Sequence, residues 1–207
     1  MHSRRPGKIA RKSVRQAKQA RSKATVEIII EAATQILADK GWRGLTTNAI
    51  AQKAGVSIGS VYEYFANKQE IVDVVLDRHL ARAEVYLRGF SGFSGDGLPM
   101  EHIVEMAVRG FIAIHQGDPK LHRVISNEVP LSTLQRNRID KLRSDAVELL
   151  AQFLEGRTED AWLKASIVVD AADALTHRWF INEAGIPVSA EAMSQELTKM
   201  LRLYVSS

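Results

Sequence analysis

The stretch that decides the fold runs from Gly44 to Lys68 and reads GLTTNAIAQKAGVSIGSVYEYFANK. Its first part, from Thr46 to Ala54, predicts a short helix, because hydroxyl side chains that can cap a helix stand at its start. Gly55 suits the left-handed turn at the end of such a helix, and Ser57 offers the cap of a second short helix that ends at Tyr64. Two short helices joined through a glycine predict a helix-turn-helix.

The two faces of this motif differ in chemistry. Apolar or small side chains stand where two steeply crossing helices must touch, at Ile50, Ala51, Ala54, Val56 and Val61. The remaining positions are mostly small, hydroxyl or amide side chains, which suit contacts with phosphates and base edges: Asn48, Gln52, Lys53, Ile58, Gly59, Ser60, Tyr62 and Tyr64. The pattern therefore predicts a surface that contacts DNA.

Helical periodicity continues on both sides of the motif. Upstream, apolar residues recur at helical spacing from Val26 to Leu37, and Lys40-Gly41 supplies a stop. Downstream, we expect helices at 69–88, 99–116, 119–126, 132–154, 159–183 and 190–204, with a glycine-rich loop at 89–97. No segment has the alternation of a strand, so the sequence predicts an all-α fold.

Charge is distributed unevenly along the 207 residues. The net charge is +4, yet nine basic residues and no acidic one lie between Met1 and Lys23. Without those nine, 19 basic residues face 24 acidic ones, a net charge of −5, and residues 24–70 alone carry −1. A basic arm (residues 1–23) on an acidic body favours contact with a polyanion.

Three other interpretations of the arm stay open: an organelle transit peptide, a helix on a membrane surface, and a solvated tail without a partner. Ile9 and Val14 are its only bulky apolar residues, which disfavours membrane binding. We expect a flexible arm in free solution, because its cations repel one another. It would order on phosphates through side chains spaced by three or four residues, among them Arg11, Arg15, Lys18 and Arg21.

Several function classes lack their signature in this sequence. No apolar run reaches the ~18 residues of a membrane span. The chain has no cysteine, which fits a reducing cytoplasm, and no HExxH, phosphate-loop or Gly-x-Ser-x-Gly motif. Asp170, Asp173 and His177 share a helical face, but we interpret them as solvated or hydrogen-bonded side chains beside a dimer seam. We therefore expect no enzyme, no metal and no cofactor.

The segment from about Ala24 to Leu76 resembles the TetR family of transcriptional regulators. The likeness rests on Gly44–Thr47, on Ile50–Ser57 and on the ending Tyr62-Glu63-Tyr64-Phe65-Ala66-Asn67-Lys68. The resemblance implies that Thr47, Tyr62 and Lys68 hold phosphates and that Ser57 caps the recognition helix. It also implies that Asn48, Ile58, Gly59, Ser60 and Tyr64 face bases. We interpret Phe65 and Val61 as core residues instead, and a core role stays the alternative for Tyr64.

The resemblance further implies a homodimer, built from the last two helices. Their apolar stripes supply the candidate interface: Trp162, Val168, Val169, Ala172, Met193, Leu197, Met200 and Tyr204. The helices between should enclose a pocket for a small-molecule effector, apolar or aromatic, for which the candidate lining residues are Phe111, His115, His122, Phe153 and Trp179.

The sequence thus predicts three parts: a flexible basic arm at 1–23, a helix-turn-helix domain of three helices at 24–68, and a larger helical effector-binding and dimerisation domain at 69–207. We expect a cytoplasmic, sequence-specific and ligand-responsive transcriptional regulator that acts as a repressor. It would bind a palindromic double-stranded DNA operator as a homodimer and leave it when a small molecule binds. The alternative is a helical protein that binds nucleic acid nonspecifically through its arm, and no membrane partner is expected.

Overall fold

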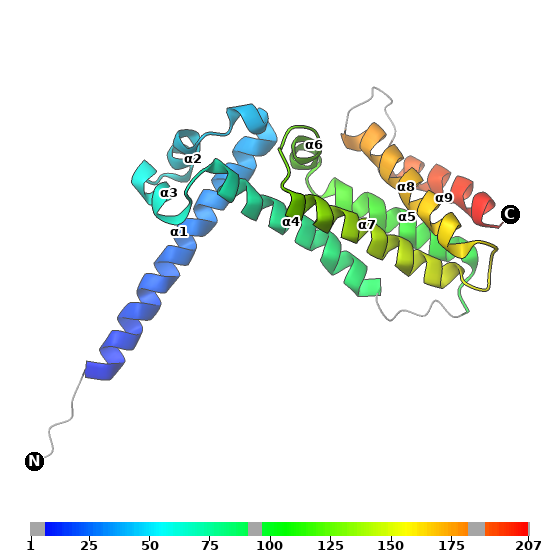
Figure 1. The fold of residues 1–207 in the computed structure, drawn as a ribbon, viewed down its shortest axis with the longest axis horizontal. Coiled ribbons are helices and arrows are strands. Elements are labelled where there is room, and N and C mark those ends of the chain that lie inside the picture. Colours follow the sequence, from blue (N-terminus) through cyan, green and yellow to red (C-terminus); the bar gives the residue numbers. More distant parts are fainter. Residues whose placement is uncertain (1–6, 91–96, 182–188, 207) are drawn as a thin grey trace, which may run out of the picture. The chain divides into compact units, whose positions relative to one another are not determined.

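The computed structural model describes residues 7–90, 97–181 and 189–206 (Figure 1). Every regular element in these ranges is a helix, which confirms the predicted all-α class. The elements are α1 Gly7–Gly44, α2 Thr47–Ala54, α3 Ile58–Tyr64, α4 Lys68–Phe90, α5 Met100–Gln116, α6 Pro119–Asn127, α7 Thr133–Leu154, α8 Ala161–Thr176, η1 His177–Ile181 and α9 Ala190–Val205. None of the described helices is both long and apolar enough to pass through a bilayer.

The chain divides into two compact units, Met1–Leu76 and Asp77–Ser207. We predicted the boundary at residue 68. The first unit extends further because the first turns of α4 bury Ile71, Val72, Val75 and Leu76. Helix α4 therefore begins in the first unit and ends in the second.

The first unit is built around the apolar face of α1. Its side chains Ile29, Ile30, Ala33 and Leu37 are almost fully buried, as the helical spacing predicts. α1 packs against α2, and α2 packs against α3. At the predicted stop the backbone of Gly41 takes a positive φ of 68°, which breaks the helical path before the short turn that ends at Gly44.

The basic arm is helical where the structure describes it, and its flexibility in free solution stays a prediction. Helix α1 already begins at Gly7, so the backbone of Arg11, Arg15, Lys18 and Arg21 is helical. The segment is rich in Ala, Lys, Arg and Gln, which favour helix, whereas each like-charge pair costs only a few tenths of a kcal/mol. Continuity with the buried part of α1 also removes the need to nucleate a separate helix.

The second unit packs α5 against α9 and α7 against α8. Its core includes Val104 and Val108 of α5, Leu154 of α7 and Met193 of α9. The helix starts are fixed by side chains: Asp118 caps α6 ahead of Pro119, and Ser132 forms a reciprocal capping box with Gln135 at α7. The predicted helix 159–183 begins at Ala161, and a π-helical turn, η1, replaces its α-helical geometry after Thr176.

Candidate functional site

The first candidate site is the helix-turn-helix of α2 and α3, and its local geometry follows from three residues. Thr46 caps α2, since its Oγ1 accepts a hydrogen bond from the backbone N–H of Ala49 at 3.1 Å. Gly55 ends α2 in the left-handed region at φ 68° and ψ 29°. Ser57 caps α3 by accepting from the N–H of Ser60 at 3.0 Å, which confirms the predicted cap.

Buried side chains hold these two short helices together. Ile50 and Ala51 of α2 and Val61 of α3 are buried, and so is Phe65 directly after α3. This agrees with the interpretation of Val61 and Phe65 as core residues. The outer residues of α3 are thereby kept at the surface.

The outer surface of α3 carries the predicted DNA contacts. Ile58 is 39% exposed and Tyr62 is 55% exposed, so both side chains are available for contact with DNA. The hydroxyls of Tyr62 and Thr47 lie 3.2 Å apart, so the two predicted phosphate contacts form one hydrogen-bonded pair from α3 and α2. One of the two hydroxyl protons is used between them, so the pair has one proton left to donate to a phosphate oxygen.

The other predicted contacts differ in availability. Asn48 and Gly59 are exposed, whereas Tyr64 is half-buried. The hydroxyl of Ser60 lies 2.9 Å from that of Ser57, and this hydrogen bond leaves it acceptor capacity for a base edge. Arg21 is exposed, and the side chains of Arg11, Arg15 and Lys18 lie outside what the structure describes.

Lys68 has a structural contact beside its predicted role. Its ammonium donates to the carbonyls of Trp42 and Leu45, each at 3.3 Å, and lies 3.8 Å from the centroid of the Trp42 ring. These contacts hold the start of α4 against the corner between α1 and α2. A phosphate at Lys68 would therefore compete with a cation–π contact and two carbonyls.

The second candidate site is an apolar cavity inside the second unit, with a volume of about 80 Å³. Its walls come from α4, α5, α7 and α8, and apart from Tyr86 the lining side chains are hydrocarbon or thioether. Phe111 and Phe153 line it as the sequence predicts. Tyr86, Phe90 and Met106 also line it and escaped prediction, since a single apolar residue on a helix does not reveal which cavity it faces.

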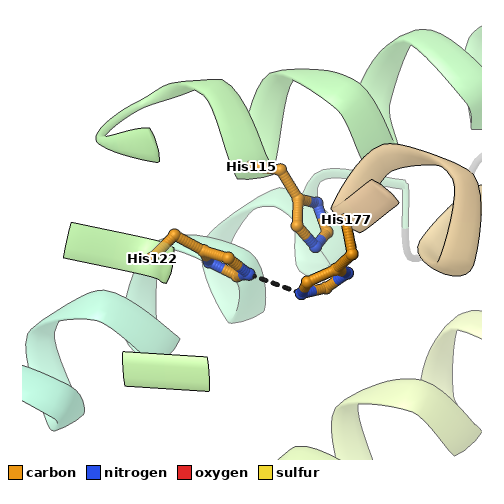
Figure 2. A group of neighbouring side chains, drawn as sticks. All are labelled: His115, His122 and His177. Carbon is orange, nitrogen blue, oxygen red and sulfur yellow. Dashed lines mark hydrogen bonds between the residues drawn. The ribbon is translucent and has the colours of Figure 1, made fainter. Parts of the chain in front are cut away.

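The remaining predicted ligand residues lie elsewhere. His115 and His122 do not line this cavity, and Trp179, in η1, packs against the core beside it. The two histidines instead belong to a cluster of imidazole rings, which we call the histidine cluster: His79, His115, His122 and His177 (Figure 2 shows the last three).

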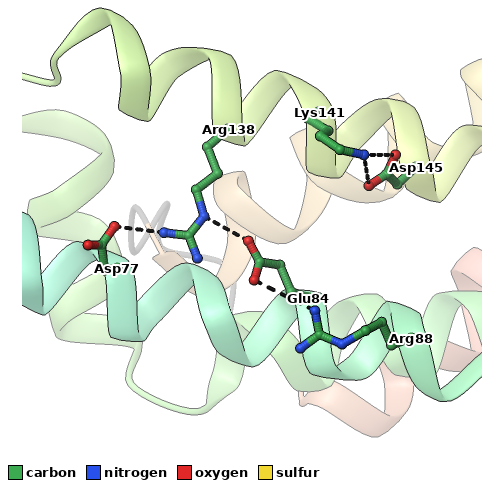
Figure 3. Close-up of polar contacts among 6 residues, drawn as sticks. All are labelled: Asp77, Glu84, Arg88, Arg138, Lys141 and Asp145. Atoms are coloured by element: carbon green, nitrogen blue, oxygen red, sulfur yellow. Dashed lines mark hydrogen bonds and ion pairs between the residues drawn. The ribbon is translucent and has the colours of Figure 1, made fainter.

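Ion pairs cover the second unit on the side where α4 meets α7 (Figure 3). Arg138 of α7 donates from Nε to Glu84 and from an η nitrogen to Asp77, both at 2.7 Å. Its hydrogen bond to Glu84 lowers the pKa of that carboxyl.

A separate ion pair joins α7 to α8. Asp170, which the sequence predicts to lie beside a dimer seam, accepts two hydrogen bonds from Arg143 at 2.6 and 2.7 Å.

The apolar side chains predicted for the dimer interface fall into two groups. Five are buried inside the protomer itself and cannot reach a partner without opening its core: Val168, Val169, Ala172, Met193 and Leu197. Tyr204 is partly buried against that core, whereas Trp162 and Met200 are 67% and 47% exposed. Leu163 and Ile167 of α8 and Leu203 of α9 are also exposed, so the two helices do present an outer apolar surface.

Comparison with known proteins places both units. Residues 29–75 match the family described as "Bacterial regulatory proteins, tetR family", and residues 99–204 match the family described as "Tetracyclin repressor-like, C-terminal domain". An HTH-type transcriptional regulator of Bacillus subtilis, YvkB, is 45% identical over 51 residues, which cover 25% of this chain. The chain spans only 27% of the length of that relative in this match.

Solved structures resemble the chain over most of its length. A TetR-family transcriptional regulator from Mesorhizobium loti aligns with a TM-score of 0.70 and 19% identity, covering 90% of this chain and 97% of that one. The regulator FadR from Bacillus subtilis, solved in complex with stearoyl-CoA, aligns with a TM-score of 0.61 and 20% identity, covering 84% and 96%. At these identities the likeness shows the fold.

Proposed function

The chain belongs to the TetR family of bacterial regulatory proteins and is a DNA-binding transcriptional regulator, and we propose that it acts as a repressor. In this proposal a homodimer binds a palindromic operator and leaves it when a small apolar molecule occupies the cavity of the second unit. The exposed surface of α3, with Ile58 and the hydroxyl pair of Thr47 and Tyr62, is the observation that supports DNA reading most directly.

Two copies are needed because one short helix reads few base pairs. A two-fold dimer presents two copies of α3 to half-sites about one helical turn of DNA apart. The outer apolar surface of α8 and α9 supports pairing, since Trp162, Leu163 and Leu203 are each more than half exposed. Burying such side chains against a second copy removes apolar area from water.

Readout in this proposal depends on shape and methyl groups more than on guanine contacts. Helix α3 contains no Arg, Lys, Asn or Gln, so the bidentate pairing of Arg with guanine is absent from it. Ile58 would contact thymine methyls, and DNA shape would add selectivity. Residues 24–70 carry a net charge of −1, so the basic arm would supply most of the attraction to phosphates.

The effector would be an apolar molecule of the acyl-chain class. The cavity walls support this choice, because they offer one hydroxyl, that of Tyr86, among hydrocarbon side chains. One structural relative binds stearoyl-CoA. Sites for drug-sized ligands hold about 300–1,000 Å³, so a ligand of that size would have to displace lining side chains from a cavity of about 80 Å³.

Helix α4 would couple the effector to DNA. It begins with residues buried in the first unit and ends with Tyr86, Leu87 and Phe90 on the cavity wall. A ligand that pushes on its last turns favours the conformations in which α4 has shifted. The free energy by which the ligand can weaken DNA binding is limited by how much more tightly the ligand binds the shifted conformation than the DNA-binding one.

Footprinting on the DNA that flanks the gene tests the regulator directly. We expect a protected, two-fold symmetric site that outcompetes unrelated DNA by on the order of 10³ or more. Tyr62→Phe should weaken binding, because the hydroxyl pair is lost, whereas Glu63→Gln next to it serves as the matched surface control. Equal competition by unrelated DNA would instead support nonspecific binding through the arm.

Two further measurements separate the parts of the proposal. Removal of residues 1–20 should make the slope of log affinity against log salt concentration less steep, by nearly one unit for each phosphate that the arm neutralises. An unchanged slope would contradict the arm's role.

Stearoyl-CoA should release the protein from its DNA site. If it raises the melting temperature without changing DNA affinity, the cavity binds but coupling through α4 is refuted.

A further inference from the structure

The histidine cluster gathers four of the six histidines of the chain inside the second unit, far apart in sequence. His79 comes from α4, His115 from α5, His122 from α6 and His177 from the start of η1. One ring nitrogen from each of His115, His122 and His177 lies within 4.8 Å of the other two (Figure 2). We propose that these three imidazoles bind one divalent transition-metal ion of the zinc type.

The hydrogen bonds fix which nitrogens are free. A backbone carbonyl only accepts, so His115 donates from Nδ1 to the carbonyl of Phe111 at 2.8 Å, and His177 donates from Nδ1 to that of Asp173 at 3.0 Å. In neutral rings this leaves Nε2 of both residues with a lone pair. Metal-binding histidines usually donate their second nitrogen to a carbonyl or carboxylate in this way.

His122 links these rings to His79. Its Nε2 lies 2.9 Å from Nε2 of His177, and its Nδ1 lies 2.8 Å from Nε2 of His79. Because Nε2 of His177 holds a lone pair, Nε2 of His122 donates to it in the metal-free protein. A bound ion would take the place of the proton on Nε2 of His122. That ring would then carry its proton on Nδ1, and His79 would carry its proton on Nδ1 instead of Nε2. Each ring keeps one proton, so no net proton is released.

His79 is accordingly an outer partner of the site. Its Nδ1 is buried and has no hydrogen-bond partner among the residues that the structure describes. This nitrogen changes from acceptor to donor in the proton shift, without breaking another bond. The ring can therefore accept from His122 and orient it toward the ion.

The distances require a small closure. With Zn–N bonds of about 2.0–2.1 Å, tetrahedral ligand atoms lie about 3.4 Å apart. Nε2 of His122 and Nε2 of His177 are already closer than this, at 2.9 Å. The ligand nitrogen of His115 lies within 4.8 Å of the ligand nitrogens of the other two, and a rotation of its ring would bring it nearer. The π-helical turn that begins at His177 is a local feature often found at binding sites.

An imidazole must be neutral to bind a metal, and the surroundings act differently on the rings: the hydrogen bond with Asp173 raises the pKa of His177, whereas His122 and His79 are shifted the other way. Burial and the neighbouring imidazoles lower the pKa of His122 to about 2, and burial, with Arg82, lowers that of His79 to about 4. The carboxylate of Asp173 adds negative charge, with Oδ1 3.6 Å from Nε2 of His115 and 3.3 Å from Nδ1 of His177. Neutral nitrogen ligands favour Zn²⁺, Co²⁺, Ni²⁺ or Cu²⁺ over the oxygen-seeking Mg²⁺ and Ca²⁺.

Titration of untagged, chelator-treated protein with Zn²⁺ and Co²⁺ tests the site, independently of any DNA or effector. We expect one ion per protomer, a higher melting temperature with Zn²⁺, and the intense visible absorption of Co²⁺ with four ligands. His115→Gln, His122→Gln and His177→Gln should each lose the absorption. His79→Gln should weaken binding by about 10–100-fold, as loss of an outer partner does.

The matched control is His102→Gln, an exposed histidine on α5, the helix that also carries His115. This variant should bind as the unaltered protein does. Should a ligand variant fail to fold, imidazole ¹⁵N spectra of the unaltered protein decide: Zn²⁺ should shift Nε2 of the three proposed ligands and of no other histidine. Binding that His102→Gln abolishes, weak six-coordinate Co²⁺ spectra, or unshifted Nε2 signals would each overturn the proposal.

Discussion

At the scale of single residues, Gly110 shapes the cavity by what it lacks. A Cβ placed on this glycine of α5 would overlap the phenol ring of Tyr86, which lies against the backbone there. Tyr86 in turn packs against Phe90 with tilted rings whose centroids lie 5.0 Å apart, and burial raises the pKa of its hydroxyl. The absence of a Cβ at Gly110 thus leaves the space that the ring of Tyr86 occupies in the cavity wall.

Replacing Gly110 by Ala should therefore reverse the usual sign of this substitution. Alanine in place of glycine within a helix normally stabilises by about 0.5–1 kcal/mol, but here the displaced ring should cost about 1–3 kcal/mol. Urea unfolding measures the change. In a Tyr86→Ala background the same substitution should stabilise the protein, as should Gly89→Ala, whose Cβ meets nothing; a destabilised double variant would contradict this account.

Residue-level prediction worked where one local rule decides. The caps at Thr46 and Ser57 and the turn at Gly55 follow from the sequence, since each depends on neighbours within three residues. The histidine cluster did not, because its rings come from four different elements and span 98 positions of the chain, from His79 to His177. Helical spacing relates His177 only to Asp170 and Asp173 just before it, and it does not show neighbours that come from other helices.

At the scale of elements, Arg138 joins α7 to α4 through Glu84 and Asp77 (Figure 3). The side chains of Arg138 and Glu84 are each 28% exposed, which leaves the pair partly shielded from solvent. A pair in this setting contributes about 0.5–1 kcal/mol after screening. It also fixes the middle of α4, the helix that we propose as the coupling element.

Arg138→Gln should lower the free energy of unfolding by that amount at pH 7. The Arg138 hydrogen bond lowers the pKa of Glu84 from its ordinary value of 4.5, so the stabilisation is present above pH 4.5 and lost as the pH falls through the lowered pKa. Unfolding curves of both proteins should therefore converge in acid. Lys141→Gln, which breaks an exposed pair within α7, is the control and should change nothing measurable; a difference that persists in acid would exclude Glu84 as its cause.

The orientation of α8 and α9 shows where element-level prediction ended. Both helices have apolar residues on more than one side, so periodicity does not distinguish the side facing the core from the side facing out. In the structure the core takes Val168 and Met193, whereas Trp162 and Leu203 remain outside. The same ambiguity explains why the predicted cavity included His115, which faces other histidines.

At the scale of the whole molecule, the outer apolar surface of α8 and α9 should determine the oligomeric state. Leu203 is 62% exposed within it, and Leu203→Glu would bring a charge into an apolar interface. We expect the dimer dissociation constant to rise about 30-fold or more, equivalent to about 2 kcal/mol. Sedimentation equilibrium measures it. Leu134→Glu changes a leucine that is 79% exposed at the start of α7 and should leave the dimer intact; dissociation by both variants, or by neither, would refute this interface.

The positions of the three tryptophans give this chain a natural set of optical reporters. Trp42 lies under the ammonium of Lys68 in the first unit, Trp162 is 67% exposed on the outer face of α8, and Trp179 follows His177 by two positions in η1. A charge over an indole, a change from water to an apolar partner, and a nearby metal ion each alter fluorescence differently. In a variant with the other two tryptophans replaced by phenylalanine, the fluorescence of the one that remains would report on a single event without an attached dye: Trp42 on DNA binding, Trp162 on dimerisation and Trp179 on metal binding.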